Sequence, residues 1–431
     1  GHVDTLTGFR NQYGFFEDLE SWIKRKASVN VIAVGISKFA EINTVYGYHF
    51  GNRVLQLFAR KVFETTGNTG SCYRIDGTKF AIISNSLNID EIQQRYDGFR
   101  YFFREAFQVD DKRIMLEING GVLKVDNFNV DSQTIYACLN FVYGESKTRH
   151  QGDMVVFHNN LNDDNKFRLE KLHDIRASIM HGYRGFYLLY QPVVDAQTER
   201  LISAEALLRW KNEKYGMVPP DQFIPLLESD PLFPELGEWI IREAIFAAKK
   251  IIRKVPEFVI NINLSYTQLE KHDFVDMVFR ILDEMGYPPD HLCFEVTERC
   301  RLLDIKLLKN VTAQLKSRGI LIALDDFGTG FSSVGLVKEL PFDIIKIDRE
   351  FVTRIEEDSA ERELMRYFAG VASLFGAKVC VEGVETSGMR DILQKFNVGS
   401  FQGYYYAKPL MFDDVYAWES KNGKKADTDN A

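Results

Sequence analysis

The sequence has few cysteines and no cysteine pattern. Only five cysteines occur among 431 residues, and no two of them form a C-x-x-C pair. An odd number of scattered thiols in a chain of this size is typical of a reducing compartment and argues against a disulfide scaffold. The eight histidines lack the short spacing of zinc ligands, so we do not expect a histidine-rich zinc site.

Long apolar runs and basic runs are also missing. No apolar segment reaches membrane-spanning length, and no signal peptide is visible. The net charge is -8, from 53 basic and 61 acidic residues. We therefore expect no polymeric nucleic acid partner, because phosphate neutralisation dominates that affinity. These features predict a cytoplasmic protein. The abrupt start at Gly1 leads us to expect an upstream sensor or membrane domain in the natural protein.

The length favours two domains, and residues 1–160 read as an α+β domain. An apolar run predicts a buried strand over residues 29–36. Apolar residues at helical spacing predict three helices, over 51–66, 88–107 and 132–147. The segment YRIDGTKFAII (73–83) predicts a β-hairpin with Asp76 and Gly77 at its tip. Because strands and helices do not alternate regularly here, a barrel is not expected.

A polar, turn-rich segment at 158–167 marks the predicted domain boundary. Beyond it, strand-like runs alternate with helical segments, which predicts a closed βα barrel over residues 161–420. The polar tail, residues 421–431, is predicted to be disordered.

Polar side chains recur near the ends of the predicted barrel strands. They are Glu205, Asn263, Glu295, Asp325, Asp326, Lys346, Asp348, Glu382, Glu385 and Gln402. Catalytic groups of βα barrels lie at the carboxyl ends of the strands. Carboxylates converging there would repel one another unless cations neutralised them, and oxygen ligands suit Mg²⁺ or Mn²⁺.

The segment LDDFGTG contains the sharpest element of this pattern. Asp325 and Asp326 follow an apolar run and precede a glycine-rich turn. Neighbours on a strand point to opposite faces, but at a strand end both can reach one site and hold two metal ions. Taken alone, such a pair is more often a cap or a turn. The recurrence of polar groups at one end of successive βα units favours a functional site.

Seven segments in order resemble the motifs of EAL-domain cyclic di-GMP phosphodiesterases. They are AEALLRW (204–210), NINLS (261–265), FEVTE (294–298), LDDFGTGFSS (324–333), IIKIDREF (344–351), VEGVET (381–386) and FQGYYYAKP (401–409). The resemblance runs from about residue 166 to 418. It implies a modified TIM-type βα barrel with one antiparallel strand.

The resemblance also implies roles for the matching residues. Two divalent cations, Mg²⁺ or Mn²⁺, would be held by Glu205, Asn263, Glu295, Asp325, Asp326 and Glu382. Lys346 would contact or orient the attacking water, and the implied catalytic residues are Glu205, Asp325, Asp326, Lys346 and Glu382. Cyclic di-GMP would be positioned by Gln191, Arg209 and Gln402. Glu298 and Glu385 would support the loop DFGTGFSS, which in this family connects the active site to a dimer interface, so a homodimer through the barrel domain is expected.

Three segments, DTLTGFRNQYGF (4–15), VGISKFAEINTVYGYHFGN (34–52) and RIDGTKF (74–80), lie in residues 4 to 157. They resemble motifs of the GGDEF family, whose active members make cyclic di-GMP from GTP on a ferredoxin-like palm. The acidic metal ligands of a cyclase are replaced by Gly35 and Ser37, and the signature hairpin carries Asp76, Gly77, Thr78 and Lys79. Glycine offers no ligand and lysine inverts the charge, so metal-assisted attack on GTP is not expected. Of the guanine-contacting pair, Asn43 is kept and Thr44 is not. The inhibitory Arg-x-x-Asp motif would fall at Gly67 and Gly70 and is absent.

The sequence thus predicts a phosphodiesterase that opens cyclic di-GMP to linear pGpG by a two-metal mechanism, with a regulatory GGDEF domain. The alternative is a receptor that binds cyclic di-GMP without hydrolysing it and signals to a partner protein. A bifunctional cyclase and phosphodiesterase is a second alternative, and GTP as an effector of the first domain is a third.

Overall fold

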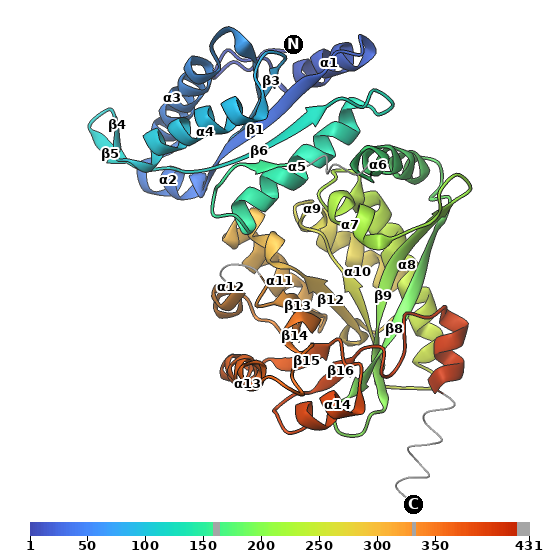
Figure 1. Cartoon of the computed structure of the whole chain (residues 1–431). Helices are drawn as coiled ribbons and strands as arrows, with labels where there is room; N and C mark the ends of the chain where they lie inside the picture. The colour runs from blue at the N-terminus through green and yellow to red at the C-terminus, as the bar shows by residue number, and fades with distance from the viewer. Residues whose placement is uncertain (158–163, 330–332, 420–431) are drawn as a thin grey trace, which may run out of the picture. The chain divides into compact units, whose positions relative to one another are not determined.

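The chain folds into two compact units (Figure 1). The computed structural model describes residues 1–157, 164–329 and 333–419, with the backbone alone at 164–167. One unit consists of Gly1–His181 and Asp221–Pro231, and the other of Gly182–Pro220 and Leu232–Ala431. Most of the predicted boundary segment (158–167) and all of the predicted disordered tail (421–431) lie outside the described residues. The barrel domain is therefore interrupted by a segment that clusters with the first unit.

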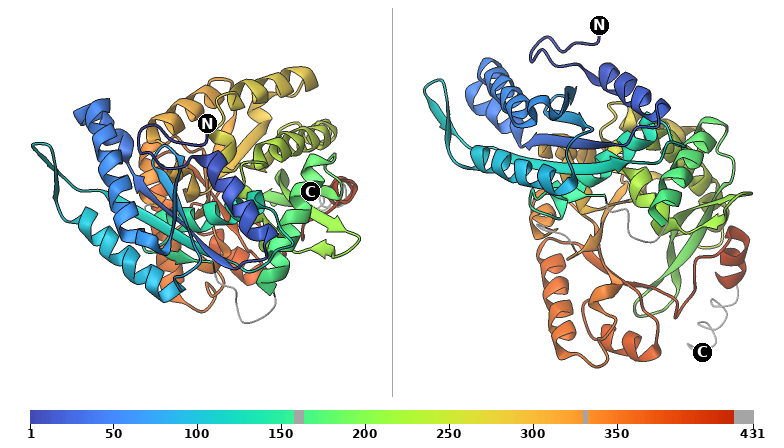
Figure 2. Two further views of the ribbon diagram at one scale, coloured as in Figure 1. Left: turned by 90° about the horizontal axis from the view of Figure 1, so that it is seen from above. Right: turned by 45° about the horizontal axis from the view of Figure 1, so that its top comes forward.

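The first unit is built on a five-stranded sheet with the order β2-β3-β1-β6-β7. Its strands are β1 (Val29–Ser37), β2 (Gly70–Asp76), β3 (Lys79–Ser84), β6 (Glu117–Val125) and β7 (Val155–Val156). The central strand β1 pairs antiparallel with β3 and β6, and all nine of its residues are buried. Helices on both faces of the sheet explain why this strand reads as a continuous apolar run (Figure 2).

Helices α3 and α4 lie side by side against one face of this sheet (Figures 1 and 2). The elements between and around the strands are α1 (Gln12–Lys24), α2 (Phe39–Tyr46), α3 (Tyr48–Thr66), η1 (Gly67–Thr69), α4 (Ile89–Arg104), β4 (Phe107–Val109), β5 (Lys112–Ile114), α5 (Ser132–Thr148), α6 (Asp164–Met180) and α7 (Pro220–Glu228). Asn88 and Glu91 form a capping box at the start of α4, which fixes the predicted helix start.

The predicted hairpin is present, but its tip lies one residue further along. Asp76 pairs with Lys79, so the two-residue loop is Gly77 and Thr78. The register shifts between Arg74 and Asp76, which places an extra residue in β2. Asp76 ends the strand instead of forming the loop, and its Oδ1 accepts a hydrogen bond from the Gly77 amide at 2.7 Å.

The second unit contains a closed barrel. The sheet order is β10-β9-β11-β12-β13-β14-β15-β16-β8, and pairing of β8 with β9 closes the ring. The strands are β8 (Phe186–Asp195), β9 (Leu201–Asn212), β10 (Gly216–Val218), β11 (Val259–Asn263), β12 (Leu292–Val296), β13 (Leu321–Phe327), β14 (Ile344–Ile347), β15 (Lys378–Glu382) and β16 (Ser400–Gln402). Strand β8 runs antiparallel to both of its neighbours, whereas β9 and β11 to β16 run parallel. The predicted modified barrel with one antiparallel strand is confirmed.

The barrel strands are joined by helices and short 3₁₀ turns, as the alternating sequence pattern predicts. These are α8 (Phe233–Ile251), α9 (Tyr266–Leu269), α10 (Phe274–Met285), η2 (Pro289–His291), η3 (Glu298–Leu302), α11 (Ile305–Ser317), α12 (Ser333–Glu339), η4 (Arg349–Phe351), α13 (Ser359–Leu374) and α14 (Ser387–Leu393). Helix α10 presents Phe274, Val278 and Ile281 to the interior and ends at Gly286, whose φ of 62° is the left-handed cap geometry.

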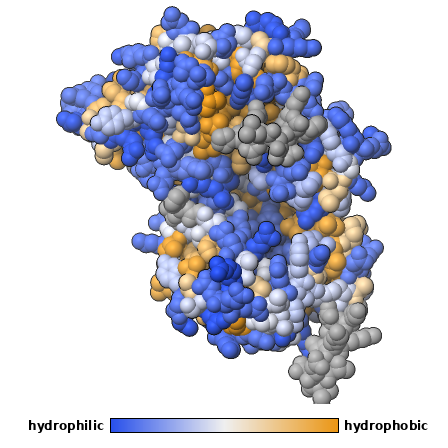
Figure 3. All heavy atoms as spheres, viewed as in Figure 1, coloured by the Kyte–Doolittle hydropathy of each residue, from blue (hydrophilic) through white to orange (hydrophobic). Residues whose placement is uncertain are grey.

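Among the described residues, no helix is long and apolar enough to cross a membrane. On the face drawn in Figure 3, hydrophilic residues predominate and the hydrophobic ones form small groups within each unit.

Candidate active site

The barrel brings most of the polar residues predicted from the strand ends to one level of its interior, and Glu385 is an exception. Neighbouring strands align Asn263 with Glu295, Glu382 with Gln402, and Gln191 with Glu205. Parallel strands present their carboxyl ends at one mouth, so these side chains converge although they are far apart in the sequence.

Lys346, on β14, is the centre of the group. Its side chain is 1% exposed, and its Nζ lies 2.5 Å from Glu205 Oε1, 2.9 Å from Glu295 Oε1 and 3.1 Å from Glu382 Oε1. One ammonium group therefore faces three carboxylates in a part of the barrel that is largely buried from solvent. A single positive charge cannot neutralise three negative ones, so the group retains an excess of negative charge.

Burial and mutual repulsion shift the pKa values of these carboxyl groups. Burial and the charge of Glu205 raise the pKa of Glu295 well above its ordinary value, and burial and the charge of Asp325 do the same for Glu382. Burial lowers the pKa of Lys346, but Glu205 and Glu295 outweigh it and hold that pKa above its ordinary value. Full ionisation of the carboxyl groups calls for more positive charge than the protein supplies.

Glu205 accepts hydrogen bonds from several neighbouring side chains. Besides Lys346, it accepts hydrogen bonds from Asn263 Nδ2 at 3.0 Å and from Gln402 Nε2 at 3.1 Å. Burial raises the pKa of Glu205, but the charge of Lys346 and these hydrogen bonds outweigh it, so the pKa lies below its ordinary value. Glu205 is thus held as a carboxylate.

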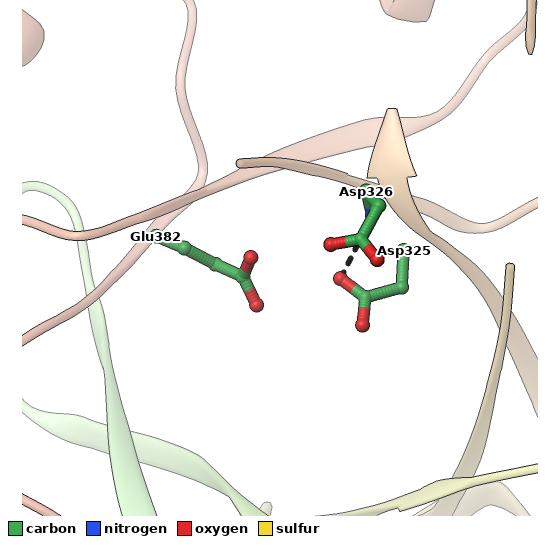
Figure 4. Close-up of side chains that lie close together, drawn as sticks. All are labelled: Asp325, Asp326 and Glu382. Atoms are coloured by element: carbon green, nitrogen blue, oxygen red, sulfur yellow. Dashed lines mark hydrogen bonds between the residues drawn. The ribbon is translucent and has the colours of Figure 1, made fainter. Parts of the chain in front are cut away.

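Asp325 and Asp326 reach one site because the strand is irregular at this point. The register of β13 on β14 shifts between Leu324 and Phe327, and Asp326 has a left-handed φ of 54°. This bulge breaks the alternation that would send adjacent side chains to opposite faces. In Figure 4 both aspartates and Glu382 point toward a common space, and one carboxylate oxygen of each lies within 4.8 Å of the others.

The aspartate pair is also strained electrostatically. Burial raises the pKa of Asp325 to about 6, and burial together with the charges of Asp325 and Asp348 raises the pKa of Asp326 to about 8. Asp325, Asp326 and Glu382 are the only group of three or more candidate ligands that meets this distance among the described residues. A divalent cation fits this oxygen-only set.

Two buried oxygen atoms add to this fit. Glu295 Oε2 and Gln402 Oε1 have no hydrogen-bond partner within the described part of the chain. Buried acceptors without a donor are costly, so such atoms call for an explanation. A bound cation or substrate would supply the missing partner.

The residues predicted to position the ligand lie on the neighbouring part of the barrel. Gln191 accepts a hydrogen bond from Gln402 Nε2 at 2.9 Å and donates to the Ala407 carbonyl at 3.2 Å. Arg209 lies four residues after Glu205 on β9 and is half-buried. Its Nη1 donates to the Leu208 carbonyl at 2.9 Å.

The two predicted loop-supporting glutamates differ in their surroundings. Glu298 is 1% exposed, and its charge is among the causes that raise the pKa of Asp326, after burial, Asp325 and Asp348. Glu385 is exposed instead of being buried beside the acidic group. Residues 330–332 of the loop between them lie outside the described residues.

The positions of a cyclase metal site in the first unit are filled by other side chains. A Cβ added at Gly35 would lie 2.2 Å from the hydroxyl of Tyr143, and Asn119 donates a hydrogen bond to Ser37. Lys79 donates to Asn140, and its Nζ lies 4.8 Å from the ring centroid of Tyr143. A tyrosine hydroxyl and an ammonium thus occupy the space beside Gly35.

The strand-end pattern misses one residue that contacts the acidic group. Asn261 Nδ2 donates to Glu295 Oε1 at 3.2 Å from a place deeper in the barrel. The alternation in NINLS could have revealed it, because Asn261 and Asn263 lie two residues apart and share a strand face.

Comparison with known proteins matches the two parts of the chain to two families. The family described as EAL domain matches residues 174–409, and the family described as diguanylate cyclase, GGDEF domain, matches residues 1–150. The bifunctional diguanylate cyclase/cyclic di-GMP phosphodiesterase MucR of Pseudomonas aeruginosa is 26% identical over 419 residues, which is 96% of this chain and 61% of MucR. The cyclic di-GMP phosphodiesterase PA2567 of the same organism is 27% identical over 421 residues, covering 97% of this chain and 71% of that protein.

A solved structure agrees with the barrel. The PaMucR phosphodiesterase in its c-di-GMP complex superposes with a TM-score of 0.53 and 32% identity, covering 57% of this chain and 99% of that one. The chain spans only about three fifths of some relatives, as it covers 60% of the Synechocystis protein sll1895 and 61% of MucR.

Proposed function

Because the chain belongs to the EAL domain family and carries a GGDEF domain before its barrel, we propose that the barrel hydrolyses cyclic di-GMP to the linear dinucleotide pGpG. Two similar proteins are named as cyclic di-GMP phosphodiesterases, and a third similarity is to a phosphodiesterase structure with c-di-GMP.

The arrangement of carboxylates around Lys346 supports this activity most strongly. Its ammonium faces three carboxylates at 2.5 to 3.1 Å, and the aspartate pair lies beside Glu382 within 4.8 Å. A receptor for cyclic di-GMP needs hydrogen-bond donors and positively charged side chains to hold the phosphates of the ligand. An excess of carboxylates would instead repel those phosphates. Carboxylates in this number fit a site where bound cations would offset the negative charge of both the protein and the substrate.

We assign the cation ligands as the resemblance implies. Glu205, Asn263, Glu295 and Asp325 would hold one cation, and Asp325, Asp326 and Glu382 the second. When bound, such cations lower the pKa of water and neutralise the charge that develops on a phosphoryl group. Mg²⁺ and Mn²⁺ both suit the oxygen-rich set. Glu295 Oε2, buried and without a hydrogen-bond partner among the described residues, supports a role as a ligand atom.

The remaining side chains bind and orient the substrate. In the proposed reaction one water adds to one phosphorus atom, the bond from that phosphorus to the 3′ oxygen breaks, and the leaving oxygen takes up a proton. Lys346 donates hydrogen bonds that fix the carboxylates and the attacking water. Arg209 pairs with a phosphate, and Gln191 and Gln402 contribute amide groups to ligand positioning.

We propose that the GGDEF domain, which is the part of the first unit up to about residue 160, does not make cyclic di-GMP. Lys79 and Tyr143 fill the space beside Gly35, and no group of three candidate metal ligands occurs in the described part of this unit. Metal-assisted attack on GTP would lack its ligands. The unit then has a regulatory or architectural role. The domain boundary near residue 160, a homodimer through the barrel, an upstream sensor or membrane domain and a cytoplasmic location all stay predictions.

The test is incubation of the purified chain with cyclic di-GMP and Mn²⁺ or Mg²⁺, followed by nucleotide chromatography. We expect pGpG to accumulate and expect chelation of the metal to stop it. Binding of cyclic di-GMP by a folded, metal-loaded protein without formation of pGpG would favour the receptor instead. Parallel incubation of the Glu205→Ala variant with GTP tests the first unit, and formation of cyclic di-GMP would show that it is a cyclase.

A further inference from the structure

A second layer of side chains lies one step below the carboxylates inside the barrel. Inward-facing residues alternate along a strand, so Ser203 precedes Glu205 by two positions and Asn261 precedes Asn263 in the same way. Ser203 is 6% exposed and Asn261 is 5% exposed. A buried amide is costly unless its donor and acceptor atoms are both satisfied, so its partners matter.

Asn261 is held at both ends of its amide. Its Nδ2 donates to Glu295 Oε1 at 3.2 Å, and its Oδ1 accepts from Ser203 Oγ at 3.0 Å. The single hydroxyl proton of Ser203 is shared between Asn261 Oδ1 and the Val259 carbonyl oxygen, which lies 2.7 Å from Ser203 Oγ. The reversed amide would place Oδ1 against Glu295 Oε1, which already accepts a hydrogen bond from Lys346 Nζ and so has no proton to offer. The network therefore directs the amide donor of Asn261 toward Glu295.

This contact makes the two oxygens of Glu295 unequal. Oε1 receives Lys346 Nζ at 2.9 Å and Asn261 Nδ2 at 3.2 Å. Oε2 is buried and has no hydrogen-bond partner within the described residues. Two donors on one oxygen resist rotation of the carboxylate, so the other oxygen is kept available as a ligand atom.

We propose that Asn261, supported by Ser203, is a positioning residue that fixes Glu295 so that Oε2 can bind a divalent cation. The inference rests on the proposed function, because that function places a cation at Glu295. Asn261 touches neither substrate nor reacting atoms in this account. It acts through the glutamate, as partners of metal ligands commonly do.

A purely structural role for Asn261 would have different consequences. If Asn261 only filled space in the barrel, its replacement would change the stability of the protein but not its affinity for metal ions. The substitution Asn261→Leu keeps a similar volume and removes the donor without adding charge. Ser203→Ala leaves Asn261 in place and removes its support. Ser400→Ala is the matched control, because Ser400 precedes Gln402 by two positions on β16 and contacts Cys380.

The experiment measures Mn²⁺ binding to the full chain by isothermal titration calorimetry, without nucleotide. Thermal unfolding in chelator checks that each variant is folded. We expect Asn261→Leu to weaken Mn²⁺ binding about 10- to 100-fold, the range seen for partners of metal ligands. Ser203→Ala should weaken it in the same direction by a smaller factor, and Ser400→Ala should leave it unchanged.

Turnover of cyclic di-GMP provides a separate readout. High Mn²⁺ should restore most of the turnover of Asn261→Leu, because the variant loses affinity and not a reacting group. Mn²⁺ affinities of Asn261→Leu and Ser203→Ala within about twofold of the parent would overturn the inference, whatever their turnover. If the parent chain bound Mn²⁺ but produced no pGpG, the proposed function would fail, while calorimetry would still decide the role of Asn261.

Discussion

Replacement of Lys346 by methionine tests whether its ammonium neutralises the acidic group. The side chain is 1% exposed, and it contacts Glu205 and Glu295, whose side chains are 7% and 0% exposed. Removing one partner of a buried ion pair costs about 3–5 kcal/mol, because a charge is left without compensation. For a unit of 150–250 residues, about 2–4 °C of unfolding midpoint corresponds to 1 kcal/mol, so the midpoint in chelator should fall by about 6–20 °C.

The assay is differential scanning calorimetry of Lys346→Met and the parent chain, in chelator and in saturating Mn²⁺. Divalent cations can neutralise the same carboxylates, so Mn²⁺ should narrow the difference, while turnover should stay low because the donor is gone. Lys306→Met, at an exposed lysine on α11, is the control and should shift stability by less than about 0.5 kcal/mol. If Lys346→Met in chelator unfolded within about 2 °C of the parent, the assigned neutralising role would be wrong.

Three further predictions concern other parts of the molecule. Asp325→Asn should abolish turnover in the chromatographic assay while circular dichroism stays unchanged, and near-normal activity would refute its role as a metal ligand. The hydrogen bond and charge of Asp131 raise the pKa of His173, so this pair stabilises below pH about 6.5 and its contribution fades as pH rises through the raised pKa. His173→Gln should therefore lower the unfolding midpoint more at pH 6 than at pH 9, and an equal loss at both would contradict this. Gly35→Ala should destabilise the first unit by about 1–3 kcal/mol in denaturant, because the new Cβ would meet the Tyr143 hydroxyl; a Tyr143→Phe background should reduce that cost.

Much of the barrel follows from the sequence because its strands repeat one physical pattern. Each is a short apolar run that ends in a polar residue, and the closed sheet brings those ends together. Periodicity of the strands therefore leads directly to Glu205, Glu295 and Glu382. The sequence does not predict that all three carboxylates contact Lys346, because those contacts depend on distances across the barrel.

The sequence predicts that Asp325 and Asp326 reach one site, because the chain turns at a strand end. The two side chains do meet, but they do so inside β13, through a bulge with a left-handed Asp326. The hairpin tip differs for a similar reason, since an extra residue in β2 moves the loop to Gly77 and Thr78. Bulges depend on the pairing of two strands, so a single segment does not reveal them.

The grouping of the segment Asp221–Pro231 with the first unit has no local signal in the sequence. The segment Asp221–Pro231 clusters with the first unit although it lies inside the EAL match. Arg176 of α6 explains part of this, because its Nε lies 2.6 Å from Oδ2 of Asp230, whose side chain is fully buried. A buried ion pair across 54 positions of sequence leaves no periodic signal.

Hydrolysis of cyclic di-GMP in water enriched in oxygen-18 distinguishes cleavage of the phosphodiester from binding alone. The metal-loaded chain is incubated with the nucleotide, and the product is analysed by mass spectrometry. We predict pGpG with one labelled oxygen on its 5′-phosphate, since water attacks phosphorus and the 3′ oxygen leaves. Recovery of cyclic di-GMP alone, from a folded protein that binds both Mn²⁺ and the nucleotide, would contradict hydrolysis by the barrel.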